Sequence, residues 1–204
     1  MNAEIIEKIK EHCGEFLCEA IGSKEHKKTV SFSHVIEPPI TNVNVPGAGD
    51  LKDFYSLVGS LTLFFCKESD EAAFYIADPD QWEDMEEGFS DWVDMLDEDE
   101  EEEALPEWFG SHKVIGEIPA SGNYILVVTE GEESGSIYEF EHDGFEFIKI
   151  GDSLAGFIDK ALDPDESTFT QIASHMRFIA GSTNQQWWAR ELHHNNGKVI
   201  RNDT

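Results

Sequence analysis

The chain has 204 residues and a formal net charge of -29 at pH 7, from 43 acidic and 14 basic side chains. A charge of this sign repels nucleic acid and anionic membranes and attracts cationic surfaces, so neither nucleic acid nor a membrane is expected as a partner. Because 40% of the residues are hydrophobic and 11% are aromatic, the chain can bury a full-sized core, which excludes a fully disordered protein.

The N-terminal region is predicted to hold a helix and a strand. Apolar residues recur at steps of three and four, which predicts an amphipathic helix over residues 3–21. Residues 29–36 alternate between apolar and polar side chains and then meet Pro38 and Pro39. A short strand is therefore predicted to end there, in an extended loop that runs to Gly49.

A short helix and a hairpin are predicted next. Asp50 is expected to cap a helix over residues 51–58, which Gly59 ends. Residues 61–66 and 73–76 are two apolar runs joined by a polar connection of hairpin length.

Residues 78–107 form an acidic segment with sixteen carboxylates and no Lys or Arg. Its aromatic and Met residues recur at helical steps, which predicts a helix over residues 81–96 with its apolar stripe on the sheet. The spacing places Trp82 in the core and leaves the positions of Trp92 and Trp108 open. The seven consecutive carboxylates at 97–103 have no apolar neighbour to bury, so their repulsion predicts a mobile loop.

An antiparallel meander of four strands is predicted to follow. Asp143 and Gly144 are typical of a tight hairpin turn with positive φ at both positions. The four strand-like runs are residues 114–118, 124–128, 136–140 and 145–150.

A last helix is predicted to close the main domain, beginning at the Gly151-Asp152-Ser153 cap and ending at Leu162. The composition then changes, because basic residues outnumber acidic ones from Ser167 onwards. Apolar spacing there predicts two helical segments broken at Gly181, which fold back onto the acidic body.

Four of these segments, in their order along the chain, carry a family resemblance. They are Leu51-Lys52-Asp53-Phe54-Tyr55 with Gly59, residues 76–82, residues 115–124 with 135–138, and residues 151–158. Together they resemble the SUKH superfamily, which includes bacterial immunity proteins and fungal glucan-synthesis regulators. The resemblance covers about residues 3–162, and the tail has no counterpart in the family. It implies an α+β fold with a central antiparallel twisted sheet flanked by N-terminal, middle and C-terminal helices.

The predicted domain division follows from this resemblance. Residues 1–162 form a SUKH-like domain with an acidic insertion at 78–107. Residues 163–204 form a helical extension that packs on the domain or is partly disordered.

Enzyme signatures are weak in this sequence. Gly151-Asp152-Ser153-Leu154 spells a hydrolase block, but it lies late in the chain and lacks the downstream Asp-x-x-His, so a helix cap explains it better. His142 and Asp143 suggest a base with its carboxylate, but side chains of neighbours at a hairpin turn are expected to diverge. We therefore expect no catalytic residues.

No metal or cofactor is expected either. The acidic run lacks the glycine of a calcium loop, and contiguous carboxylates cannot all face one ion. His193 and His194 are adjacent, which makes a poor zinc pair. Cys13, Cys18 and Cys66 show no metal-binding spacing, and their odd number fits core positions in a reducing compartment.

The N-terminus has no secretory signal pattern and the chain no run of eighteen apolar residues, so we expect a cytoplasmic protein. The resemblance implies a non-catalytic immunity protein that neutralises a toxin domain, and the acidic face predicts a basic partner, for example a nuclease. A regulatory scaffold of the same fold is the alternative, and a hydrolase or metal-dependent enzyme is a more remote one. The acidic segment itself has a second interpretation, as a solvated insertion that only keeps the protein soluble. The predicted partner-binding residues are Asp84, Glu87, Asp91, Trp92, Asp94, Met95, Glu98 and Trp108.

Overall fold

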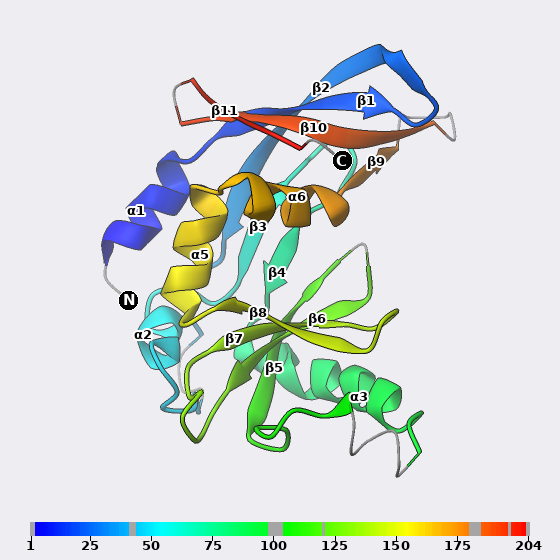
Figure 1. The fold of residues 1–204 in the computed structure, drawn as a ribbon. Coiled ribbons are helices and arrows are strands. Elements are labelled where there is room, and N and C mark those ends of the chain that lie inside the picture. Colours follow the sequence, from blue (N-terminus) through cyan, green and yellow to red (C-terminus); the bar gives the residue numbers. More distant parts are fainter. Residues whose placement is uncertain are drawn as a thin grey trace.

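The computed structural model describes residues 3–40, 44–97, 104–119, 121–179, 185–195 and 197–202. Within them the chain is α+β, with one large antiparallel sheet and five α-helices (Figure 1). The strands are β1 Gly14–Ala20, β2 Ser23–Ile36, β3 Leu61–Phe65, β4 Phe74–Ile76, β5 His112–Ile118, β6 Asn123–Val128, β7 Ile137–Glu141, β8 Glu146–Gly151, β9 Arg177–Ile179, β10 Gln186–His194 and β11 Lys198–Arg201. The helices are α1 Ala3–Glu11, α2 Leu51–Tyr55, α3 Trp82–Val93, α5 Leu154–Leu162 and α6 Glu166–Ser174, and a 3-10 turn, η1 Pro79–Gln81, precedes α3. None of the described helices is long and apolar enough to cross a membrane.

The sheet runs in the order β11-β10-β1-β2-β3-β4-β5-β6-β7-β8, and β9 pairs with β10. The long strand β2 joins its two parts, because it pairs with β1 in one part and with β3 in the other. The predicted hairpin of β3 and β4 and the predicted meander of β5 to β8 are both confirmed.

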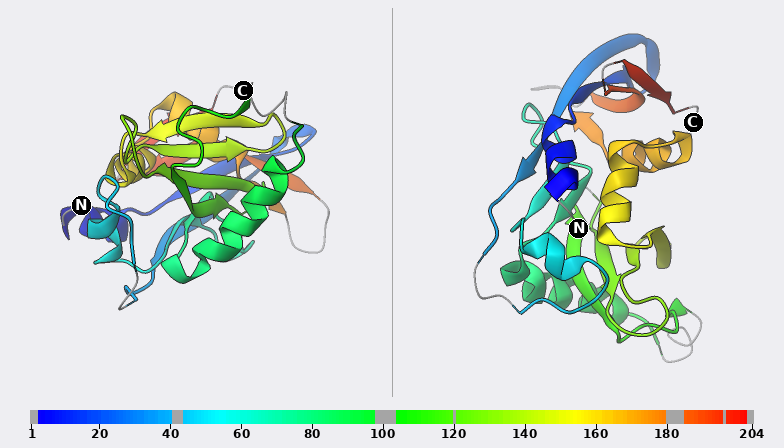
Figure 2. Two further views of the ribbon diagram at one scale, coloured as in Figure 1. Left: turned by 90° about the horizontal axis from the view of Figure 1, so that it is seen from below. Right: turned by 90° about the vertical axis from the view of Figure 1, so that its left-hand side faces the viewer.

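Helices cover both faces of the part of the sheet that holds β3 to β8, as the view from below shows (Figure 2). On one face, α3 packs over a small aromatic core formed by Phe89, Val114, Leu126 and Phe140. On the other, α5 contacts β8 and carries Phe157 to within 5.1 Å, ring to ring, of Phe74 on β4. The main core lies on this second face and continues beneath β1 and β10.

The predicted helix over residues 3–21 is correct only as far as Glu11. Residues 14–20 form β1, in which Phe16, Cys18 and Ala20 are buried on alternate positions. Gly14 explains the difference, since a Cβ there would lie 2.2 Å from the carbonyl oxygen of His193 on β10. The close approach of the two backbones therefore requires glycine and favours a strand over the helical propensity of this segment.

The predicted second helical segment of the tail is wrong. The described residues of the tail hold one helix, α6, and Trp187 and Trp188 lie in β10, which pairs with β1 on one side and β11 on the other. The register shifts between Leu17 and Cys18 of β1, which pair with Glu191 and Ala189, so Arg190 is an extra residue in β10. The buried residues of β10 on either side of it, Ala189 and Leu192, are therefore three positions apart. A three-residue step of this kind resembles helical periodicity in sequence.

Two local predictions about turns and caps also need correction. Asp50 occupies the N-cap position of α2 as predicted, and its carbonyl oxygen accepts the Phe54 N–H at 3.0 Å, but its side chain makes no cap hydrogen bond there. The Asp50 carboxylate instead accepts the N–H groups of Leu154 and Ala155, at 3.1 and 2.9 Å. Ser153 caps α5 as predicted, by accepting the Gly156 N–H at 3.0 Å. The turn between β7 and β8 was predicted to have positive φ at Asp143 and Gly144. The positive φ angle is instead at the next residue, Phe145 (52°).

Three histidines form a row, in which His12 and His194, from near the two ends of the chain, are buried and His34 on β2 is half-buried. His12 Nδ1 lies 2.6 Å from His34 Nε2, and His12 Nε2 lies 3.0 Å from His194 Nδ1. Because the Phe64 N–H donates to His34 Nδ1 at 3.1 Å, neutral His34 must carry its proton on Nε2 and donate it to His12, which in turn donates to His194. One backbone N–H thus sets the tautomer of all three rings.

Candidate partner-binding face and polar cleft

The 3-10 turn η1, which leads directly into the acidic helix α3, begins at a well-formed cap. The Asp78 side chain accepts the Asp80 N–H at 3.1 Å, and the Gln81 side chain accepts the Asp78 N–H at 3.3 Å. Trp82 is buried, as predicted, with its ring 5.2 Å from that of Tyr55. Phe89, two turns further on, fills the aromatic core, so the apolar stripe of α3 faces the sheet as the spacing predicts.

One α3 carboxylate serves as an anchor. Glu86 Oε2 lies 3.1 Å from Lys113 Nζ and 3.2 Å from the Val114 N–H, and its other oxygen lies 3.3 Å from His112 Nε2. Burial would raise the pKa of Glu86, but these hydrogen bonds outweigh it and lower the pKa to about 2. The charge of Glu86 therefore holds α3 to β5 and is directed away from the outer face.

The predicted binding carboxylates lie on the outer face. Asp84, Glu87, Asp91 and Asp94 are exposed, and no described Lys, Arg or His forms an ion pair with them. Met95 follows them with 71% of its surface exposed. Glu98 lies outside the described residues.

The two predicted tryptophans are half-buried and lie at different places beside α3. Trp92 lies at the end of α3 with its ring 4.6 Å from that of His142. Trp108 follows the acidic segment and packs on Tyr138 and Phe147, at 4.6 and 5.4 Å between ring centroids. The helix thus brings Trp92 together with the carboxylates, whereas Trp108 joins an aromatic surface on β7 and β8.

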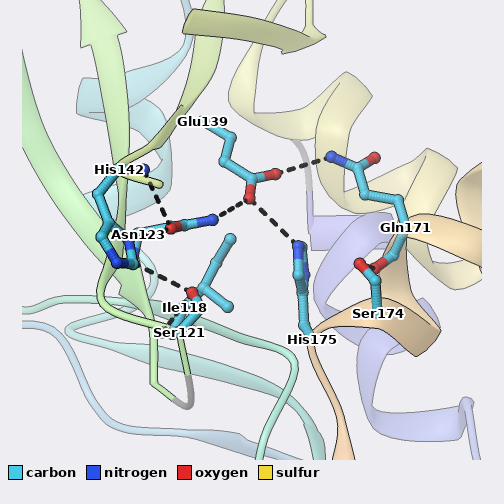
Figure 3. A network of polar contacts seen from close by, with 8 residues as sticks. All are labelled: Ile118, Ser121, Asn123, Glu139, His142, Gln171, Ser174 and His175. Atoms are coloured by element: carbon cyan, nitrogen blue, oxygen red, sulfur yellow. Dashed lines mark hydrogen bonds and ion pairs between the residues drawn. The ribbon is translucent and has the colours of Figure 1, made fainter. Parts of the chain in front are cut away.

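A polar cleft of about 600 Å³ lies on the opposite face of β6 and β7, beside α6 (Figure 3). Its centre is Glu139, which is only 2% exposed. The Glu139 carboxylate accepts hydrogen bonds from Asn123 Nδ2 and Gln171 Nε2, each at 2.8 Å, and lies 3.2 Å from His175 Nε2. Burial would raise the pKa of Glu139, but these contacts outweigh it and hold the pKa below its ordinary value.

His142 connects the cleft with the α3 face. Its Nδ1 lies 2.8 Å from Asn123 Oδ1, and its Nε2 lies 3.2 Å from Asp143 Oδ1. The expectation that the side chains of His142 and Asp143 diverge is therefore wrong, because the turn between β7 and β8 is long enough for them to meet. The same ring lies 4.6 Å from that of Trp92 on α3, with the two ring planes tilted by 43°.

Sequence reasoning did not find the cleft. Its residues come from β6, β7 and α6, and no local spacing connects Asn123, Glu139 and His175. The one available signal was a carboxylate within an otherwise apolar strand, since Glu139 stands between Tyr138 and Phe140.

Among the described residues, no group of three or more His, Cys, Asp or Glu side chains is arranged to hold a metal ion. Comparisons with protein-family models, with curated proteins and with solved structures gave no match to this chain.

Proposed function

We propose that this protein is a non-catalytic binding protein of SUKH-like fold, and that it neutralises a basic toxin domain, such as a nuclease, through the outer face of α3. The observation that carries the proposal is the row of exposed carboxylates on that face, Asp84, Glu87, Asp91 and Asp94, which form no ion pair with the described Lys, Arg and His residues and lie beside the half-buried Trp92. Carboxylates give long-range attraction, and aromatic side chains supply the short-range contacts that are enriched at binding hot spots.

The position of these charges supports a role in binding over a role in stability. The C-terminal end of a helix carries a partial negative charge, which favours Lys or Arg there. In α3 the last turn has no basic residue, and Asp91 and Asp94 lie at this end. The arrangement costs stability, and attraction of a cationic partner offsets such a cost when the complex forms.

The order of elements supports the fold proposal. The short helix α2, the β3-β4 hairpin, the Trp-bearing α3, the four-strand meander and α5 follow one another as in the SUKH resemblance. The strands β9 to β11 are an addition to that order, so the resemblance gives them no role.

The experiment that tests the proposal uses the product of the gene adjacent to this one, because a toxin and its antidote must be inherited together. We expect that co-expression of this protein restores the survival of cells that produce the adjacent product, and that the purified proteins form a complex. A catalytically inactivated form of the adjacent product serves as the control for expression. Toxicity that persists despite full-level expression of both proteins would refute the immunity role.

A further inference from the structure

The strand β8 forms one end of the sheet, because only β7 pairs with it. Residues 146–149 pair one to one with β7, and Ile150 is an extra residue that ends this regular stretch. In an antiparallel ladder, every second residue of an end strand directs its N–H and C=O groups away from its neighbour. Within the described residues, no hydrogen bond engages those groups in residues 146–149. This edge can therefore accept another strand.

The charge that commonly protects a sheet edge is offset in β8. Charged side chains, Lys above all, keep other strands away from an exposed edge. The strand carries Lys149, but its Nζ lies 2.8 Å from a carboxylate oxygen of Glu133 and 2.9 Å from one of Asp152. The neighbouring side chain of Ile148 is 40% exposed. The edge thus presents an apolar side chain next to a lysine whose charge is already paired.

The two faces of β8 differ in chemistry, because side chains alternate along a strand. On one face lie Ile148 and Glu146, and the exposed Glu146 forms no ion pair with a described Lys, Arg or His. On the other face lie Lys149 and the half-buried Phe147, whose ring is 5.4 Å from that of Trp108. The first face attracts a basic side chain, and the second offers aromatic rings to an apolar one.

We propose that the edge of β8 binds an extended segment of a partner protein, in which basic and apolar residues alternate, as an additional strand of the sheet. The main chain of the segment supplies the missing hydrogen bonds. Its basic side chains lie beside Glu146, with their methylenes on Ile148. Its apolar side chains lie on the opposite face, beside Phe147 and Trp108.

A basic segment suits this edge better than a second copy of the chain does. At the edge, Glu133, Glu146 and Asp152 outnumber Lys149, and the whole chain carries a net charge of -29, so two copies repel each other there. The same charges attract a basic segment of another protein. A toxin domain that docks on α3 is one source of such a segment, but the inference does not rest on the proposed function, because none of these contacts involves α3.

The test is an NMR titration of the isotope-labelled protein with the peptide Ac-Arg-Val-Arg-Val-Arg-Val-Arg-NH2. We expect saturable binding with a dissociation constant below about 1 mM, and hydrogen exchange slowed at least about tenfold at every second amide of residues 146–149. The peptide Ac-Arg-Arg-Val-Val-Val-Arg-Arg-NH2 has the same charge without the alternation and is expected to leave these exchange rates unchanged. Equal effects of the two peptides, or no saturable binding of the first, would overturn the proposal.

Methylation of the peptide N–H groups tests the strand geometry. In an extended peptide, the N–H groups of the Val residues and those of the Arg residues between them point to opposite edges, and only one edge faces β8. One version of the alternating peptide is N-methylated at its Val residues and a second version at its two central Arg residues. We expect one version to lose binding and the other to retain it. Loss in both versions, or retention in both, would contradict the addition of a strand.

Matched variants locate the site. Glu146→Lys is expected to bind the alternating peptide at least about tenfold more weakly, because attraction becomes repulsion. Glu25→Lys makes the same change of charge at an exposed position on β2 and is expected to bind as the unmodified protein does. Equal weakening in both variants would show that only the net charge is sensed, which contradicts the proposal. Slower exchange of residues 146–149 at high protein concentration without peptide would assign the edge to a second copy and overturn it. These measurements need no toxin, so their outcome is separate from that of the survival experiment.

Discussion

Two carboxylates, Glu86 and Glu139, hold helices onto the sheet. Hydrogen-bond donors surround them, whereas the carboxylates of the α3 face are exposed. Glu86 joins α3 to β5 through Lys113 and the Val114 N–H, and Glu139 joins β7 to α6 through Gln171 and His175. In both cases several donors surround one charge, which lowers the pKa of each carboxyl despite burial. At the residue scale, therefore, Glu86 and Glu139 are structural carboxylates, in contrast to the exposed carboxylates of the α3 face.

Glu86→Gln tests the first of these anchors. The substitution keeps an oxygen acceptor but removes the charge that Lys113 faces, so we expect a loss of about 1 to 2 kcal/mol in the free energy of unfolding, measured with urea. Glu87→Gln removes the same charge from the exposed face of the same helix and is expected to change stability by less than about 0.5 kcal/mol. Equal effects of the two substitutions would show that Glu86 is not an anchor.

The histidine row predicts a pH dependence. The pKa of His12 is lowered from 6.5 to about 4, chiefly by burial and then by the charges of His194 and Lys8, against the opposing charge of Asp163. Burial likewise lowers the pKa of His34 to about 3. The unfolded chain therefore binds protons on these rings at a higher pH than the folded chain does.

Stability is thus expected to be complete above about pH 6.5 and to fall as the pH drops towards 4, by about 3 kcal/mol for His12 alone. The check is urea unfolding across this range for the unmodified protein and for His12→Gln, which cannot be protonated. The variant should show a shallower fall, whereas His26→Gln, at an exposed position, should follow the unmodified protein. Identical curves for all three proteins would contradict the role of the row.

Among the elements, α5 depends on a residue more than one hundred positions earlier in the chain. Asp50 accepts its first two N–H groups, and Ser153 accepts the third from Gly156. We expect Asp50→Ala to cost about 1 to 2 kcal/mol in urea unfolding and Asp50→Asn to cost less, because Asn keeps one acceptor oxygen. If Asn and Ala were equally harmful, the cost would come from something other than the cap.

Helices and strands were predicted correctly where their apolar periodicity and their pairing partners lie within neighbouring segments of the sequence. The meander, the β3-β4 hairpin and the apolar stripe of α3 each follow from a pattern within one or two neighbouring segments. Residues 14–20 and 186–194 were mispredicted as helical because each becomes a strand by pairing with the other, about 170 residues away. No local pattern contains that pairing, and the extra residue Arg190 in β10 further interrupts the alternation of buried side chains in that strand.

The same distinction applies to the candidate sites. The α3 face was predictable because its carboxylates and Trp92 are consecutive turns of one helix. The polar cleft was not, since Asn123, Glu139 and His175 meet only when β6, β7 and α6 come together. A site assembled by tertiary structure leaves at most single unusual residues in the sequence.

On the scale of the whole molecule, the charged residues that give the net charge of -29 are unevenly distributed along the chain. Residues 78–107 carry sixteen carboxylates without one Lys or Arg, whereas the tail from β9 to β11 contains Arg177, Arg190, Lys198 and Arg201. Because the tail lies at the opposite end of the sheet from α3 (Figure 1), the α3 end is the more negative one. Such an asymmetry orients an approaching basic protein before contact.

The measurement that tests the central claim most directly is the rate of association with the adjacent-gene product across a series of salt concentrations. The triple variant Asp84→Lys, Asp91→Lys and Asp94→Lys is compared with Glu11→Lys, Glu25→Lys and Glu68→Lys, which reverses three exposed charges far from α3. We predict that the α3 variant associates at least about tenfold more slowly at low salt and loses most of its salt dependence, while the control variant retains both. Equal rates and equal salt dependence in the two variants would contradict binding through the α3 face.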